Sequence, residues 1–90
     1  MIPDLTPAQY ERLAILMEEA AEVIQIIGKI QRHGYESRHP DGGPTNREML
    51  EKEIGHVNYA VNLLWMKAEI AQSSILFHRN LKEKMKGYLL

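Results

Sequence analysis

The chain has 90 residues, a length that bounds it to one small domain with a thin hydrophobic core, for which self-association would be a natural supplement. Its 11 basic and 12 acidic residues give a net charge of −1, which argues against a surface for nucleic acid polymers, and the lack of cysteine excludes disulfides and thiolate metal sites. The opening "MIPDLTPAQYERL" lacks the basic and then apolar pattern of a signal peptide, and no uncharged apolar run approaches the roughly 18–20 residues of a membrane span, so we expect a cytoplasmic protein with no membrane partner.

A first helix is predicted over residues 7–33. Thr6 suits the N-cap, and Pro7 suits the first helical position, where its missing N–H costs nothing. No further proline appears before His33, and Gly34 suits a left-handed C-terminal cap. At 1.5 Å per residue this helix would be about 40 Å long, which is unusual for so small a protein.

This first helix carries apolar residues on two faces. The larger face, at helical spacing, consists of Leu13, Leu16, Ala20, Val23, Ile24, Ile27 and Ile30. A second face, roughly opposite, consists of Ile15, Glu19, Glu22 and Ile26. A helix that is apolar on two sides is packed on two sides, so we expect a long central helix with carboxylates set into a second interface.

The second helix follows the one clear loop, "YESRHPDGGPT" over residues 35–45, whose prolines and glycines rule out continuous regular structure. Thr45 and Glu48 match the capping box that opens a helix. The end of this helix is poorly marked, and Ser73 and Ser74 offer a cap for a last helix. No strand pattern appears. The predicted class is all-α, a bundle of three to four helices over residues 1–90 as a single domain, completed by oligomerisation.

Two pairs of polar side chains share one spacing. Glu19 and Glu22 are three residues apart in the first helix, as are Glu53 and His56 in the second, so each pair lies on one helical face, and Glu18 flanks Glu22 one turn away. If the pairs face each other across a bundle, they gather the ligands of a divalent cation. Glutamates at this spacing are also common on solvated faces, so both interpretations stay open on residue chemistry alone.

Two runs of the sequence carry a family resemblance. "EEAAEVIQIIGKIQRHG" and "HPDGGPTNREMLEKEIGHVNYAVNLL" resemble the MazG-like nucleoside triphosphate pyrophosphohydrolases of the all-α pyrophosphatase superfamily, in particular the short forms met in phages and bacteria. That family carries E-x-x-E on one helix and E-x-x-D on the next. The resemblance covers about residues 13–64 and is weaker in the basic last helix.

The resemblance implies a function and a set of ligands. It assigns metal binding to Glu19, Glu22 and Glu53, with Glu18 as a further acidic member, and it implies Mg²⁺, with Mn²⁺ as an alternative. It also implies a homo-oligomer, a homodimer or homotetramer, that hydrolyses a nucleoside triphosphate to the monophosphate and pyrophosphate. For this chemistry a spare carboxylate takes the proton of the attacking water, and Glu18 and Glu19 are the candidates.

His56 departs from the family pattern, because it stands where the family has aspartate. Imidazole is a poor Mg²⁺ ligand but suits Mn²⁺, Zn²⁺ and other transition metals. His56 therefore either keeps a ligand while changing the metal, or ends a metal site and weakens catalysis. In the second case the chain would be a catalytically impaired helical protein that binds a nucleotide or a partner.

Several polar residues are candidates for binding the substrate. They are Lys29, Arg32, Asn46, Arg47 and Lys82. Lys29 lies two turns from Glu22 in nearly the same direction, and Lys82 belongs to a basic last helix that could reach over the site. The same cations also suit solvated positions, and those near a helix C-terminus are favoured there by the helix dipole.

Overall fold

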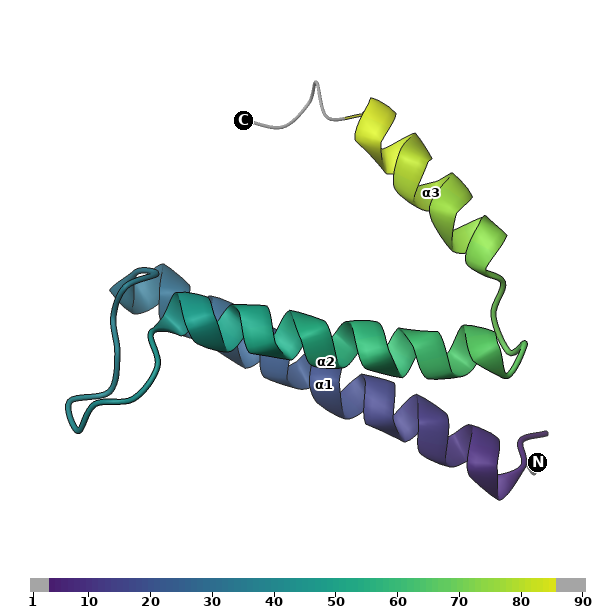
Figure 1. The fold of residues 1–90 in the computed structure, drawn as a ribbon, viewed down its shortest axis with the longest axis horizontal. Coiled ribbons are helices and arrows are strands. Elements are labelled where there is room, and N and C mark those ends of the chain that lie inside the picture. The colour runs from purple at the N-terminus through teal and green to yellow at the C-terminus, as the bar shows by residue number, and fades with distance from the viewer. Residues whose placement is uncertain (1–3, 86–90) are drawn as a thin grey trace.

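The chain folds into three helices in the computed structural model, which describes residues 4–85. They are α1 (Pro7–His33), α2 (Asn46–Met66) and α3 (Gln72–Lys84), and Figure 1 shows α1 and α2 lying along each other while α3 projects away. Over residues 4–85 there is no strand, only one isolated antiparallel bridge between Arg38 and Thr45. The predicted all-α class is confirmed.

Local capping explains both ends of α1. The Gln9 N–H donates to Thr6 Oγ1 (3.1 Å), and the Thr6 N–H donates to Gln9 Oε1 (2.9 Å), which completes a capping box behind Pro7. At the other end the Gly34 N–H donates to the Ile30 carbonyl (2.7 Å). Gly34 has the predicted positive φ of 88°, but its ψ of 167° lies outside the left-handed helical region, so it turns the chain directly into the loop.

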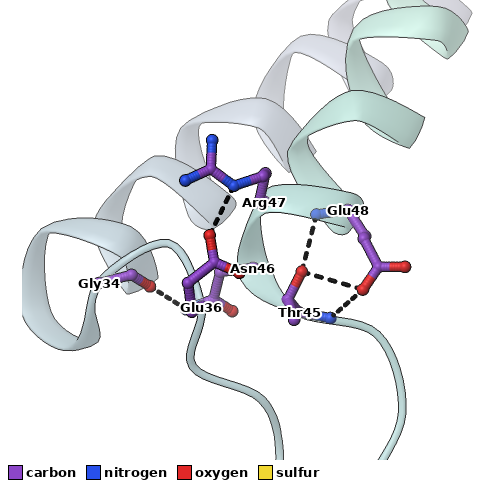
Figure 2. A network of polar contacts seen from close by, with 6 residues as sticks. All are labelled: Gly34, Glu36, Thr45, Asn46, Arg47 and Glu48. Atoms are coloured by element: carbon purple, nitrogen blue, oxygen red, sulfur yellow. Dashed lines mark hydrogen bonds and ion pairs between the residues drawn. The ribbon is translucent and has the colours of Figure 1, made fainter.

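The loop returns the chain to the start of α2, where the predicted capping box is confirmed. The Glu48 N–H donates to Thr45 Oγ1 (3.2 Å) and the Thr45 N–H donates to Glu48 Oε1 (3.0 Å), as Figure 2 shows. In the same view the side-chain amide of Asn46 donates to the Gly34 carbonyl (3.1 Å). This bond ties the start of α2 to the end of α1 and fixes both helices as a hairpin.

The α1–α2 interface contains the core. Ile26 from α1 and Ala60 and Leu64 from α2 are the buried hydrophobic residues among those the structure describes. Near the open end of the hairpin the Arg12 guanidinium donates two hydrogen bonds to the Glu69 carboxylate, from Nε (2.7 Å) and Nη2 (3.0 Å). A bidentate pair of this kind fixes orientation as well as adding attraction.

The larger apolar face of α1 is only partly covered within the single chain. Leu13, Ile24 and Ile27 leave 44%, 70% and 42% of their surface exposed. The face that packs on α2 is the one containing Ile26, on which the acidic residues also lie. The packed face is the less apolar of the two, so the choice between them depends on α2, whose Ala60 permits close approach and whose polar residues match the acidic face of α1.

The last helix stands apart. α3 begins at Gln72 after Ala71, which makes no side-chain capping bond, so the expectation that Ser73 or Ser74 caps it is wrong. The preceding helix ends at Met66 with Lys67 as its C-cap, and Ala68 has a positive φ of 58° that redirects the chain. Every described residue of α3 is exposed. No helix within residues 4–85 is long and apolar enough to cross a membrane.

The Arg12–Glu69 pair generates a prediction for stability against pH. Hydrogen bonds from Arg12 lower the pKa of Glu69 in the folded protein below its usual value. The ion pair therefore stabilises the fold fully at pH values above the pKa of an unfolded glutamate, about 4.3. This contribution is lost as the pH falls through the lower pKa of the folded state. We expect Glu69→Gln to lower the melting temperature at pH 7, with a difference from the natural chain that shrinks toward pH 3. Thermal melts over this range measure it, with the exposed Glu51→Gln as control. A difference that does not change with pH would contradict the role of the ion pair.

Candidate metal centre

Four side chains from two helices meet at the middle of the hairpin. Glu19 and Glu22 come from α1, and Glu53 and His56 come from α2. One ligand atom from each lies within 4.8 Å of the others. The spacing of three in each helix turns both members of a pair to the same side, and the antiparallel hairpin turns the two sides toward each other. The four residues are called the acidic cluster below.

Glu53 is the buried member of the acidic cluster, with 6% of its surface exposed. Its Oε2 is buried and accepts no hydrogen bond from any residue that the structure describes. His56 Nδ1 lies 3.5 Å from Glu53 Oε2, and the ammonium of the exposed Lys52 lies 3.7 Å from Glu53 Oε1. Burying a carboxylate oxygen without a partner is unfavourable, so this position calls for a cation.

Electrostatics within the cluster point the same way. The pKa of Glu22 is raised, first because its carboxyl shares a hydrogen bond with Glu53, and then because of desolvation and of repulsion from the Glu53 charge. His56 and Lys52 oppose this shift. The two carboxylates therefore disfavour each other's charged form. A divalent cation bound between them would offset that repulsion, because carboxylates bind a metal in the deprotonated form.

The donor set fits a hard or borderline cation. Three carboxylates are the ligands that Mg²⁺ prefers, whereas the imidazole of His56 is better suited to Mn²⁺ or Zn²⁺. His56 Nδ1 lies 3.2 Å from Glu19 Oε2, so these two ligands already adjoin. Glu18 is exposed and lies outside the cluster, one turn from Glu22. Its position suits a base beside the cluster rather than a ligand within it.

The predicted substrate residues separate into two groups. Lys29, Arg32 and Asn46 line one cavity of about 630 Å³ at the loop end of the hairpin. Arg47 does not line it: its Nε donates to Glu36 Oε1 (2.6 Å), and its guanidinium lies 4.5 Å from the centre of the Tyr35 ring. Lys82 lies on α3, which stands apart from α1 and α2 (Figure 1), and it belongs neither to the acidic cluster nor to the lining of the cavity.

The cavity also contains a residue that sequence reasoning did not select. His39 lines the cavity from the loop, together with Arg38 from the loop and His33 from the end of α1, two cations that the sequence already offered for a phosphate. The concentration of cations around "RHGYESRH" is the signal that could have found His39. Asn46, in contrast, has 7% of its surface exposed, and its side-chain amide donates to the Gly34 carbonyl, so its observed contact is structural.

No protein-family model, curated protein or solved structure matches this chain. The likeness to MazG-like enzymes therefore stays a prediction from the quoted residues.

The acidic cluster generates a prediction for metal binding. A cation that binds only the folded state, at 100 times its dissociation constant, adds about 2.7 kcal/mol of stability, or on the order of 10 °C in melting temperature for a domain of this size. We expect Mn²⁺ or Mg²⁺ to produce such a rise in thermal melts, and Glu53→Gln to abolish it. Glu51→Gln, an exposed glutamate on the same helix, should leave the rise intact. Equal responses from the two variants would show that the metal binds elsewhere.

Proposed function

We propose that this chain is a metal-dependent, MazG-like nucleoside triphosphate pyrophosphohydrolase, which produces a nucleoside monophosphate and pyrophosphate in the cytoplasm. The observation that carries the proposal is the buried Glu53 carboxylate, one oxygen of which lacks a hydrogen bond while facing two further carboxylates across the hairpin. His56 Nδ1 lies 3.5 Å from that oxygen, too far for a good hydrogen bond, so this contact does not satisfy it. In a site that binds a cation and a phosphate, this oxygen is expected to lack a partner in the protein alone.

The residues of the acidic cluster would bind the metal that the hydrolysis requires. Glu19, Glu22, Glu53 and His56 would hold the cation, which supplies neutralisation of phosphate oxygens and a lowered pKa of a bound water. In the hydrolysis a water oxygen forms a bond to the α-phosphorus, and the bond from that phosphorus to the bridging oxygen breaks. Pyrophosphate then leaves with the electron pair.

Glu18 is the better of the two base candidates. Its carboxylate is exposed and lies one turn from Glu22, outside the set of ligands, so it can accept the proton of the attacking water. Glu19 is the other candidate, but its carboxylate already contacts His56. A base that is separate from the ligands predicts that metal binding and turnover can be removed independently.

Turnover is tested by pyrophosphate release from a panel of ribo- and deoxyribonucleoside triphosphates, first with Mg²⁺ and then with Mn²⁺. We expect release by the natural chain, its loss in Glu22→Ala, and a fall of roughly 10²–10⁴-fold in Glu18→Gln with the metal-induced rise in melting temperature retained. Activity only with Mn²⁺ would identify His56 as a ligand that changes the metal. Glu51→Gln serves as the matched control.

A second candidate function follows from the contacts of His56. Its Nδ1 lies within 3.2–3.5 Å of two carboxylates, so a protonated imidazole can balance the cluster charge in place of a metal. The chain would then be a nucleotide- or partner-binding protein without turnover. Release of pyrophosphate by the His56→Asp variant but not by the natural chain would favour this candidate. No release by either protein would reject the hydrolase.

We also propose that the working form is a homo-oligomer, a homodimer or homotetramer, formed through the exposed apolar face of α1. That face recurs at alternating spacings of three and four, as in a coiled-coil seam. Its members are Tyr10, Leu13, Met17, Ala20, Ile24 and Ile27, called the outer stripe below. Met17 and Ile24 each leave 70% of their surface exposed.

The size of the exposed surface supports a second copy of the chain as the occupant. The chain exposes 7561 Å², against about 5,400 Å² for a compact monomer of this mass. Its radius of gyration is 16.5 Å, against about 12 Å for a compact chain of this length. A standard interface takes roughly 800 Å² from each partner, which the excess provides more than twice over.

Sedimentation equilibrium tests the assembly. We expect the natural chain to sediment as a multiple of its 10.4 kDa mass and Ile24→Lys to weaken self-association by at least roughly tenfold, because a lysine in the middle of the outer stripe must be desolvated. Gln25→Lys, an exposed neighbour off the stripe, is the matched control. A monomeric natural chain, or equal effects of the two lysines, would contradict the proposal.

A further inference from the structure

The cavity at the loop end of the hairpin has a charge opposite to that of the acidic cluster. Its volume is about 630 Å³, and its permanent cations are Lys29 and Arg32 from α1 and Arg38 from the loop, with His33 and His39 beside them. No carboxylate belongs to the lining among the residues that the structure describes. The cavity is called the basic pocket below.

Two members of the basic pocket already have contacts within the chain: Arg38 Nη1 donates to the Gly43 carbonyl (3.3 Å), and His39 Nδ1 lies 3.5 Å from Asp41 Oδ2. Elsewhere, Arg12 and Arg47 are neutralised by Glu69 and Glu36. Within residues 4–85, by contrast, no ion pair involves Lys29 or Arg32. Unpaired cations that converge on one cavity raise the local potential and favour an anion.

The helix dipole does not account for this arrangement. It favours cations in the last turn of α1, where Arg32 and His33 lie. Lys29 precedes that turn, and Arg38 comes from the loop. Lys29 and Arg32 from α1 and Arg38 from the loop therefore line one cavity, and the helix dipole favours only Arg32 among them.

The position of the basic pocket relates it to the acidic cluster. Lys29 follows Glu22 by seven residues, which is roughly 10 Å along α1 and about 20° around it. Both side chains therefore leave α1 on the same side. The cavity volume lies in the range of small-molecule sites, and Pro40, Pro44 and Met49 add apolar lining. A small phosphorylated ligand fits both its size and its charge.

We propose that the basic pocket binds a diphosphate group: inorganic pyrophosphate, or the polyphosphate end of a nucleotide whose other end lies at the acidic cluster. The choice of pyrophosphate rests on the proposed function, whereas the existence of an anion site does not. Lys29 and Arg32 donate to the phosphate oxygens from α1, and Arg38 donates from the loop. The phosphate backbone of a nucleic acid is a less suitable occupant, because the neighbouring acidic cluster repels an extended polyanion.

Isothermal titration of the full chain with inorganic pyrophosphate, in metal-free buffer at physiological salt, tests the pocket without the hydrolase. We expect binding by the natural chain, and a loss of at least roughly tenfold in affinity for each charge removed in Lys29→Gln and Arg32→Gln. A Lys67→Gln/Arg79→Gln double variant removes two cations outside the pocket and should bind as the natural chain does. Circular dichroism shows whether each variant is folded.

Three results would overturn the proposal. They are no binding of pyrophosphate by the natural chain, equal losses in the pocket and control variants, and tighter binding of a nucleoside monophosphate or a single-stranded oligonucleotide than of pyrophosphate. The outcome is independent of turnover. Binding of pyrophosphate without metal, together with no hydrolysis, would support the anion site and reject the enzyme. Hydrolysis without metal-free binding would support the enzyme and reject the anion site.

Discussion

The buried carboxylate of Glu53 is the constraint on which the hairpin depends. It lies in the α1–α2 interface with one oxygen unsatisfied, opposite Glu19 and Glu22. Packing alone would exclude such a group, since the same position filled by a leucine would add to a core that contains only three buried hydrophobic residues in the described part of the chain. The interface therefore gives up stability in favour of a charged site, as functional sites commonly do.

This compromise leaves the single chain with little hydrophobic stabilisation. Ile26, Ala60 and Leu64 form a small core, while the outer stripe and α3 stay exposed. Because hydrophobic stabilisation scales with the apolar area removed from water, the largest remaining source lies outside the hairpin. Burying that surface against a second copy would also hold α1 in place behind the acidic cluster. Assembly and the precision of the site would then be linked.

Local features of the fold could be predicted from the sequence, and those that depend on distant partners could not. Thr6 and Thr45 start their helices through bonds to residues three positions away, so short stretches contain the whole signal. Which face of α1 packs on α2, in contrast, depends on residues some 30 positions away. The same holds for His39, whose place in the basic pocket follows from the path of the loop. The four members of the acidic cluster are an intermediate case, because helical spacing aligns each pair and only their meeting needs the hairpin.

Charge along the hairpin is arranged in sequence, with the acidic cluster in the middle and the basic pocket at the loop end. A net charge of −1 hides this separation, which is why composition argues only against large polyanions. Glu22 and Lys29 lie roughly 10 Å apart along the axis of α1, and no ion pair joins Lys29 to the acidic cluster within the described residues, so the two regions of charge stay separate. A ligand that combines a metal-bound phosphate with further anionic groups would satisfy both ends together. The segregation of charge is thus an argument for a polyphosphate, over a single phosphate, as the ligand that we propose for this surface.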